Sequence, residues 1–143
     1  MKSDNVFKLV FPSRSCNEAF ARTAVASFAS SLDPTIDELA DIRTAVSEAV
    51  TNCIVHAYRD TIGLIFISTK ISGQTVTVSV RDRGCGIEDI ERAMQPTFTT
   101  DAAAERAGLG FSVMGAFMDS LKVRSKPGSG TTVTMKKRIA ARE

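Results

Sequence analysis

The feature that most constrains this chain is a short alternating run that ends in an aspartate and two glycines, TVTVSVRDRGCG at residues 75–86. Valines occupy one side of the alternation and threonine or serine the other, which predicts a half-buried strand. Asp82 falls on the valine side, where burying a carboxylate is costly unless hydrogen-bond donors reach it. We therefore expect Asp82 to accept hydrogen bonds at this position, and a ligand is one source of donors.

Composition places the chain among ordinary soluble proteins. Its 143 residues are 43% hydrophobic and 24% charged, which fits a single domain over residues 1–143. The apolar runs are too short for a membrane span and the start lacks a targeting pattern, so we expect a cytoplasmic protein without membrane contact. A net charge of +2 is too small to favour direct nucleic-acid binding. The three cysteines lack metal-type spacing and favour neither disulfides nor zinc.

Hydrophobic spacing predicts the other elements. Strands are expected at residues 5–11, 62–71, 75–82, 121–127 and 131–138, and helices within 15–32, 34–60 and 88–95 and at about 109–121. The first helix is expected to face the core with Phe20, Ala24, Phe28 and Leu32. The second is expected to do so with Leu39, Ile42, Val46, Ala49, Cys53 and Ala57.

The order of these elements predicts a two-layer α/β sandwich, with helices on one face of a mixed, mostly antiparallel sheet. Residues 96–107 show no clear period and lie between a proline and a glycine. We interpret them as a mobile lid, and a short alanine-rich helix is the alternative.

A row of polar residues lies on the second predicted helix. Glu48, Asn52 and His56 are each four residues apart, so their side chains would lie along one line. A carboxylate there could orient or deprotonate a hydroxyl group, and an amide oxygen is a neutral ligand suited to Mg²⁺. Taken alone, such a row is more often a solvated helix edge.

Two glycine pairs follow Asp82 along the chain. Gly84 and Gly86 would let a flat heterocycle approach the backbone while it donates an amine hydrogen bond to the carboxylate. Gly108 and Gly110 come just before a predicted helix, where exposed N–H groups favour a phosphate. An ordinary turn and a flexible helix entry explain these pairs equally well when each is taken alone.

The last strand also begins with a glycine, Gly130, followed by Thr131 and Thr132. A threonine hydroxyl there could reach the same heterocycle, although any hairpin end has this composition. The specific signal is the ordered set of four motifs, each at the position where the predicted elements require it.

The segments SEAVTNCIVHAY, DRGCGI, AGLGF and GSGTT resemble the N, G1, G2 and G3 boxes of the GHKL ATPase and kinase superfamily. Within it the chain is similar to the sporulation anti-sigma F factors, and NEAFARTAV, PTFTT and ERAGLGF share this likeness. The resemblance implies the α/β sandwich of the GHKL (Bergerat) ATP-binding type, with ATP and Mg²⁺ as cofactors.

The resemblance also implies a role for each box residue. Glu48 would be the catalytic base or a group that orients the hydroxyl, Asn52 the Mg²⁺ ligand and Asp82 the acceptor for the adenine amine. The remaining assignments are Gly84 and Gly86 to the adenine pocket, Gly108 and Gly110 to the phosphates, and Thr131 or Thr132 to a further adenine contact.

Two arginines and the single histidine are assigned in the same way. Arg106 would neutralise charge on the γ-phosphate, with a surface arginine as the alternative. Arg22 resembles the position through which the family contacts protein partners, with a solvent-facing helix residue as the alternative. His56 is interpreted as a packing residue, because a phosphoacceptor histidine lies on a separate dimerisation helix in the relatives that autophosphorylate.

The implied function is an anti-sigma factor that is also an ATP-dependent protein serine kinase. It would bind a sigma factor of the sigma F type, phosphorylate a serine of a STAS-type anti-anti-sigma protein, and form a homodimer through the sheet surface or first strand. A general-stress anti-sigma kinase, or a nucleotide-gated sigma-binding module without phosphotransfer, is the alternative. Gyrase- and chaperone-type ATPases, and sensor kinases, carry further domains or a histidine helix that we do not expect here.

Overall fold

The computed structural model describes residues 4–90, 93 and 102–141, with the backbone alone for residues 102–109. In chain order the elements are β1 (Asn5–Pro12), α1 (Asn17–Ala29), the 3-10 turn η1 (Ser30–Leu32), α2 (Ile36–Asn52), the π-helical turn η2 (Cys53–Ala57), β2 (Leu64–Ser72), β3 (Thr75–Asp82), α4 (Ala102–Phe117), β4 (Ser120–Lys126) and β5 (Gly130–Arg138). All five strands begin and end within two residues of the predicted positions. Of the short helix predicted at 88–95, residues 90 and 93 are helical, and 91, 92, 94 and 95 lie outside the described residues.

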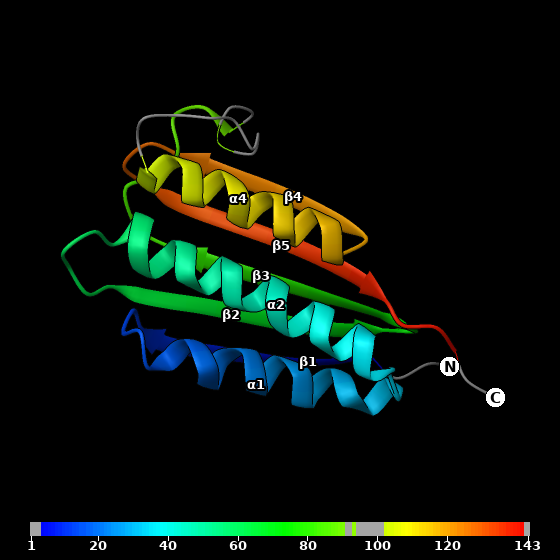
Figure 1. The fold of residues 1–143 in the computed structure, drawn as a ribbon. Coiled ribbons are helices and arrows are strands. Elements are labelled where there is room, and N and C mark those ends of the chain that lie inside the picture. The colour runs from blue at the N-terminus through cyan, green and yellow to red at the C-terminus, as the bar shows by residue number, and fades with distance from the viewer. Residues whose placement is uncertain (1–3, 91–92, 94–101, 142–143) are drawn as a thin grey trace.

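The five strands form one sheet in the order β1-β2-β3-β5-β4. Each neighbouring pair is antiparallel, so the prediction of a mixed sheet is wrong and its mostly antiparallel character is confirmed. Figure 1 shows α1, α2 and α4 side by side over the same face of this sheet. The predicted two-layer α/β sandwich is therefore confirmed.

The core lies between the helices and the sheet, with α2 in the middle of the helical layer (Figure 1). Alternate residues of each strand point into it, as the burial of β2 and β3 shows. The largest fully buried side chains are Ile42, Ile65, Ile67, Met114, Met135, Ile139, Val25, Val46, Val50, Val76, Val78 and Val80. Among the described residues, no helix is long and apolar enough to span a bilayer.

The buried face of α1 differs from the prediction. Ala21, Val25 and Ala29 are fully buried, whereas Phe20 is 58% exposed. The buried row has the same four-residue spacing as the predicted one but lies one residue further along the helix, which is about 100° around its axis. Of the aromatic members of the predicted row, only Phe28 packs inward, with its ring 4.8 Å from that of Phe7.

α4 begins earlier than predicted. Residues 102–107, interpreted as part of a lid, form its first turns, and residues 96–101 lie outside the described part of the chain. Three successive alanines at 102–104 favour helix strongly and account for the early start. Gly108 and Gly110 therefore lie inside α4 and not before its N-terminus, so their predicted position at a helix entry is wrong, while their contact with a phosphate stays a prediction.

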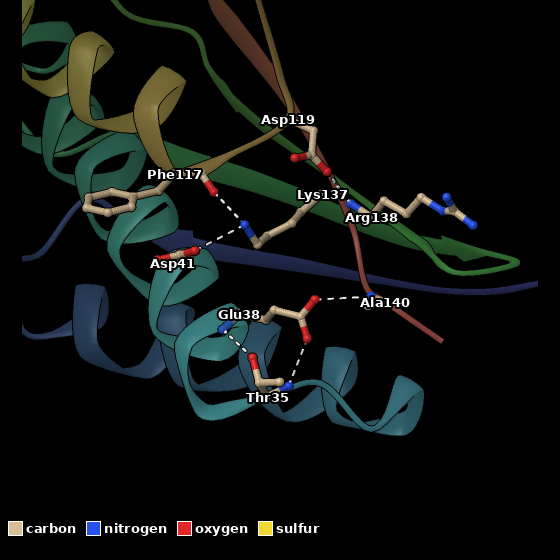
Figure 2. Close-up of polar contacts among 8 residues, drawn as sticks. All are labelled: Thr35, Glu38, Asp41, Phe117, Asp119, Lys137, Arg138 and Ala140. Atoms are coloured by element: carbon tan, nitrogen blue, oxygen red, sulfur yellow. Dashed lines mark hydrogen bonds and ion pairs between the residues drawn. The ribbon is translucent and has the colours of Figure 1, made fainter. Parts of the chain in front are cut away.

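The N-terminal end of α2 is fixed by a capping box (Figure 2). The Thr35 hydroxyl accepts from the Glu38 N–H at 3.0 Å, and the Glu38 carboxylate accepts from the Thr35 N–H at 2.8 Å. Glu38 also accepts from the Ala140 N–H at 3.1 Å, which ties the helix start to the chain after β5. The backbone hydrogen bond from Thr35 is the main cause that lowers the pKa of Glu38.

One turn further along α2, a half-buried ion pair joins three elements (Figure 2). The Lys137 ammonium on β5 donates to the Asp41 carboxylate on α2 at 3.1 Å and to the Phe117 carbonyl at the end of α4 at 2.8 Å. These contacts hold the first half of α2 against β5 and α4. The second half carries the candidate site.

Candidate functional site

The second half of α2 carries two of the predicted polar residues, Glu48 and Asn52, one turn apart and half-buried. Both face Gly110 on the neighbouring α4. A Cβ atom at that glycine would lie 3.2 Å from Glu48 Oε2 and 3.3 Å from Asn52 Oδ1. The Glu48 carboxylate and the Asn52 amide therefore both lie next to Gly110. A larger residue at position 110 would narrow the space beside them.

The third member of the predicted row, His56, lies beyond the end of α2. The chain winds into the π-helical turn Cys53–Ala57, which ends with Tyr58 N–H donating to the Cys53 carbonyl at 3.0 Å. His56 therefore belongs to the π turn and not to α2, which carries Glu48 and Asn52.

Asp82 lies at the end of β3 with 5% of its surface exposed, on the core-facing side as its position in the alternation predicts. One carboxylate oxygen, Oδ1, accepts from the Gly84 N–H at 2.9 Å and the Thr131 N–H at 3.2 Å. Burial raises the pKa of Asp82 above its ordinary value, and these hydrogen bonds partly oppose the increase.

The other carboxylate oxygen, Oδ2, faces a cysteine. The Cys53 thiol donates to it over 3.5 Å, and the cysteine is itself 4% exposed. Burial, and then the nearby Asp82 charge, raise the pKa of Cys53 well above its ordinary value, so the thiol keeps its proton. Cys53 follows Asn52 directly. The point where α2 meets the π turn therefore carries both the Asn52 amide and the thiol that donates to the Asp82 carboxylate.

The glycines beside Asp82 permit close backbone contacts. A Cβ atom at Gly84 would collide with the Ala57 carbonyl, and one at Gly86 with the Lys126 carbonyl. Gly86 also has a φ of +76°, a left-handed conformation that favours glycine. The segment after β3 is thus held against the end of the π turn and against the β4–β5 hairpin.

Tyr58 was missed as a site residue by sequence reasoning. Its hydroxyl donates to the Leu64 carbonyl and accepts from the Arg83 N–H, both over 2.6 Å. Burial raises the pKa of Tyr58, so the hydroxyl stays protonated as this pairing requires. The sequence shows only a single tyrosine close to the end of a predicted helix, which does not reveal a contact across 25 residues.

The two predicted threonines lie on opposite faces of the sheet. Thr131 is buried, shares the face of Asp82 and pairs with it in the strand register. Thr132 pairs with Arg81 and so lies on the face that the helices leave open. Of the two, Thr131 alone is placed beside Asp82.

Of the two predicted arginines, Arg22 takes no part in the hydrogen bonds described for the site. The Arg22 guanidinium on α1 pairs with Glu18 at 3.2 Å and remains 42% exposed, and Glu18 also accepts from Ser47 on α2. Arg106 belongs to the first turns of α4, and its side chain lies outside the described residues.

The donors and acceptors present fit a nucleotide with a bound cation. Asn52 Nδ2 is buried and has no hydrogen-bond partner among the described residues. A buried polar group without a partner is costly in a folded protein, so this amide has capacity for a ligand. Oδ2 of Asp82 likewise receives only the Cys53 thiol within the described part of the chain. The described residues hold no cluster of three His, Cys, Asp or Glu side chains, so a cation there would rely on Asn52, phosphate and water.

Residues 11–137 match the family described as the histidine kinase-like ATPase domain. Proteins named anti-sigma F factor are similar over nearly the full length of both chains. One from Thermoanaerobacter pseudethanolicus is 60% identical over 99% of each chain, and one from Caldanaerobacter subterraneus subsp. tengcongensis is 59% identical over 97% of each. One from Clostridium acetobutylicum is 50% identical over 96% of each.

A solved structure shares the fold. It is the histidine kinase domain of a blue-light activated histidine kinase from Erythrobacter litoralis, with a TM-score of 0.56 and 21% identity. The match covers 85% of this chain and 60% of that one.

Proposed function

We propose that this chain, which belongs to the histidine kinase-like ATPase family and to the anti-sigma F factors within it, inhibits a sigma factor and is an ATP-dependent protein serine kinase. The sigma factor would be of the sigma F type that controls sporulation, and the kinase substrate a serine of a STAS-type anti-anti-sigma protein. The observation that supports the proposed kinase activity is that Glu48 and Asn52 both face Gly110.

The nucleotide would lie along the junction of α2 and the π turn. Asp82 would accept the adenine amine, between Gly84 and Gly86 on one side and Thr131 on the other. Asn52 would ligate Mg²⁺ through its amide oxygen Oδ1, and its unpartnered Nδ2 would donate to the bound nucleotide. At the phosphate end, the family resemblance supports Gly108 and Gly110 as backbone contacts and Arg106 as the neutralising charge.

Bound ATP would supply the phosphoryl group, and Mg²⁺ would neutralise charge on its phosphates. As the substrate serine oxygen bonds to the γ-phosphorus and the bond to ADP breaks, Glu48 would accept the serine proton. Its half-buried position beside Asn52 supports this role, because a base must lie within hydrogen-bond reach of the proton it takes.

Protein partners would bind at exposed surfaces. Arg22 is half-exposed on α1 and would contact the sigma factor or its antagonist. A homodimer would form through the open face of the sheet or the β1 edge, and Val6 and Val10 on β1 expose 55% and 53% of their surfaces there. A single domain over residues 1–143 would provide all these functions in the cytoplasm.

The test is transfer of label from γ-labelled Mg²⁺-ATP in host lysate, with wild type, Glu48→Gln and Asp37→Asn compared. Asp37 lies in the first turn of the same helix, far from Gly110, and serves as the matched control. We expect one small protein to acquire acid-stable, alkali-labile label, as phosphoserine does, with wild type and Asp37→Asn only.

Label on histidine would identify a histidine kinase instead of a serine kinase. ATP binding without any labelled protein, together with capture of the sigma factor, would identify a nucleotide-gated binding module. Equal transfer by Glu48→Gln would overturn the assignment of the base.

A further inference from the structure

Asp82 is held so that its two oxygens have different surroundings. Oδ1 accepts two backbone N–H groups, from Gly84 and Thr131. Both donors are fixed by the chain itself, because one follows the strand by two residues and the other lies opposite in the strand register. Oδ1 therefore has its acceptor capacity filled before any ligand binds.

The position of Oδ2 depends on a side chain as well as on the two N–H groups that hold Oδ1. The thiol of Cys53 is its hydrogen-bond donor within the described residues, at 3.5 Å, and both partners are almost fully buried. A thiol is a weak donor, so it can hold the carboxylate in position while leaving the second lone pair of Oδ2 available. A water-exposed cysteine such as Cys16 could not act in this way, because solvent would compete.

We infer that Cys53 is a positioning residue that turns Oδ2 of Asp82 toward the nucleobase and thereby selects a purine with a 6-amino group. This inference rests on the proposed ATP site. A carboxylate oxygen can only accept, so it pairs with the adenine amine and rejects the carbonyl of a 6-oxo purine. Were the carboxylate free to rotate, both the pairing and the rejection would weaken.

The experiment compares dissociation constants for ATP and for purine riboside triphosphate, which lacks only the 6-amino group. Cys53→Val keeps similar volume without a donor, Cys53→Ser restores a donor, and Cys16→Val is the control. We expect Cys53→Val to raise the dissociation constant for ATP about threefold to tenfold, and that for purine riboside triphosphate by less than about twofold. Cys53→Ser should recover part of the loss, and Cys16→Val should match wild type.

Asp82→Asn tests the orientation independently. With Oδ1 kept by the two N–H groups, the amide nitrogen would replace Oδ2 and donate toward the base. We expect this variant to lose affinity for ATP and to prefer inosine triphosphate, whose 6-oxo group accepts.

Equal weakening of both nucleotides by Cys53→Val would show a packing role only and overturn the inference. So would an Asp82→Asn variant that still prefers ATP. If wild type binds ATP and Asp82→Asn loses it while Cys53→Val keeps the wild-type ratio, the inference fails and the proposed function stands. If wild type binds no nucleotide, both fail.

Discussion

At the scale of single residues, the most informative group is Asp82. Strict alternation of valines places it on the buried side of β3, so its position was predictable from the sequence. Its partners were not, because Cys53 lies 29 residues earlier and Thr131 lies 49 residues later in the chain. Contacts between residues so far apart in the sequence produce no local sequence pattern from which they could be predicted.

Burial of this carboxylate predicts a pH dependence. The pKa of Asp82 in the folded state is raised above its ordinary value of 3.8, so the ionised form costs folding free energy. This free-energy cost is absent well below pH 3.8. It develops as the pH rises through 3.8 and then through the raised pKa of Asp82 in the folded state. Asp82→Asn lacks it, so its free energy of unfolding relative to wild type should increase from about pH 4 to about pH 7. Urea unfolding at both pH values checks this, and a constant difference would contradict the burial argument.

At the scale of elements, the site is built where α2 changes into a π turn. The first half of α2 is fastened by the capping box at Thr35 and by the Lys137 contacts, and the second half presents Glu48 and Asn52 to α4. The helix and its acidic first turns were predictable from Pro34 and the spacing of apolar residues. The π turn was not, since five-residue hydrogen bonding leaves no distinct period in so short a segment.

Two glycines on α4 give a matched pair of variants. A Cβ atom at Gly115 would have Leu121 Cδ2 as its nearest neighbour, at 3.8 Å, so Gly115→Ala should stabilise the fold by ~0.5–1 kcal/mol and leave phosphotransfer unchanged. The same change at Gly110 gains helix propensity but presses on Glu48 and Asn52 at 3.2 Å and 3.3 Å. We expect Gly110→Ala to reduce phosphotransfer by about tenfold or more without unfolding. Thermal unfolding and label transfer measure both, and wild-type transfer by Gly110→Ala would argue against a site at this contact.

At the scale of the whole molecule, charge is divided between the two sides of the sheet. The outward positions of the five strands carry none of the 16 acidic residues and eight of the 18 basic ones. These are Lys8, Lys70, Arg81, Lys122, Arg124, Lys126, Lys136 and Arg138. The sequence shows the alternation that groups them, but not which face the helices leave open. The small net charge of +2 therefore does not reveal that the open face of the sheet is strongly basic.

This charge distribution bears on the proposed homodimer. If two open faces meet, like charges approach each other, and salt screens the repulsion. The dissociation constant of the dimer should then fall by several-fold as sodium chloride rises from about 0.05 M to about 0.5 M. Sedimentation equilibrium measures this, and Lys122→Gln/Arg124→Gln should flatten the dependence while Arg43→Gln on α2 should not. A dimer indifferent to salt would point to pairing through the β1 edge.

The π turn sets a limit on the spacing between two parts of the site. Asn52 directly precedes it, and Tyr58, which is hydrogen-bonded to Leu64 and Arg83, follows its end. Removing one residue between them would restore ordinary helical winding and pull the tyrosine away from both anchors, while a substitution would leave the span unchanged. A change in the number of residues in this short segment should therefore disturb the site more than most substitutions within it.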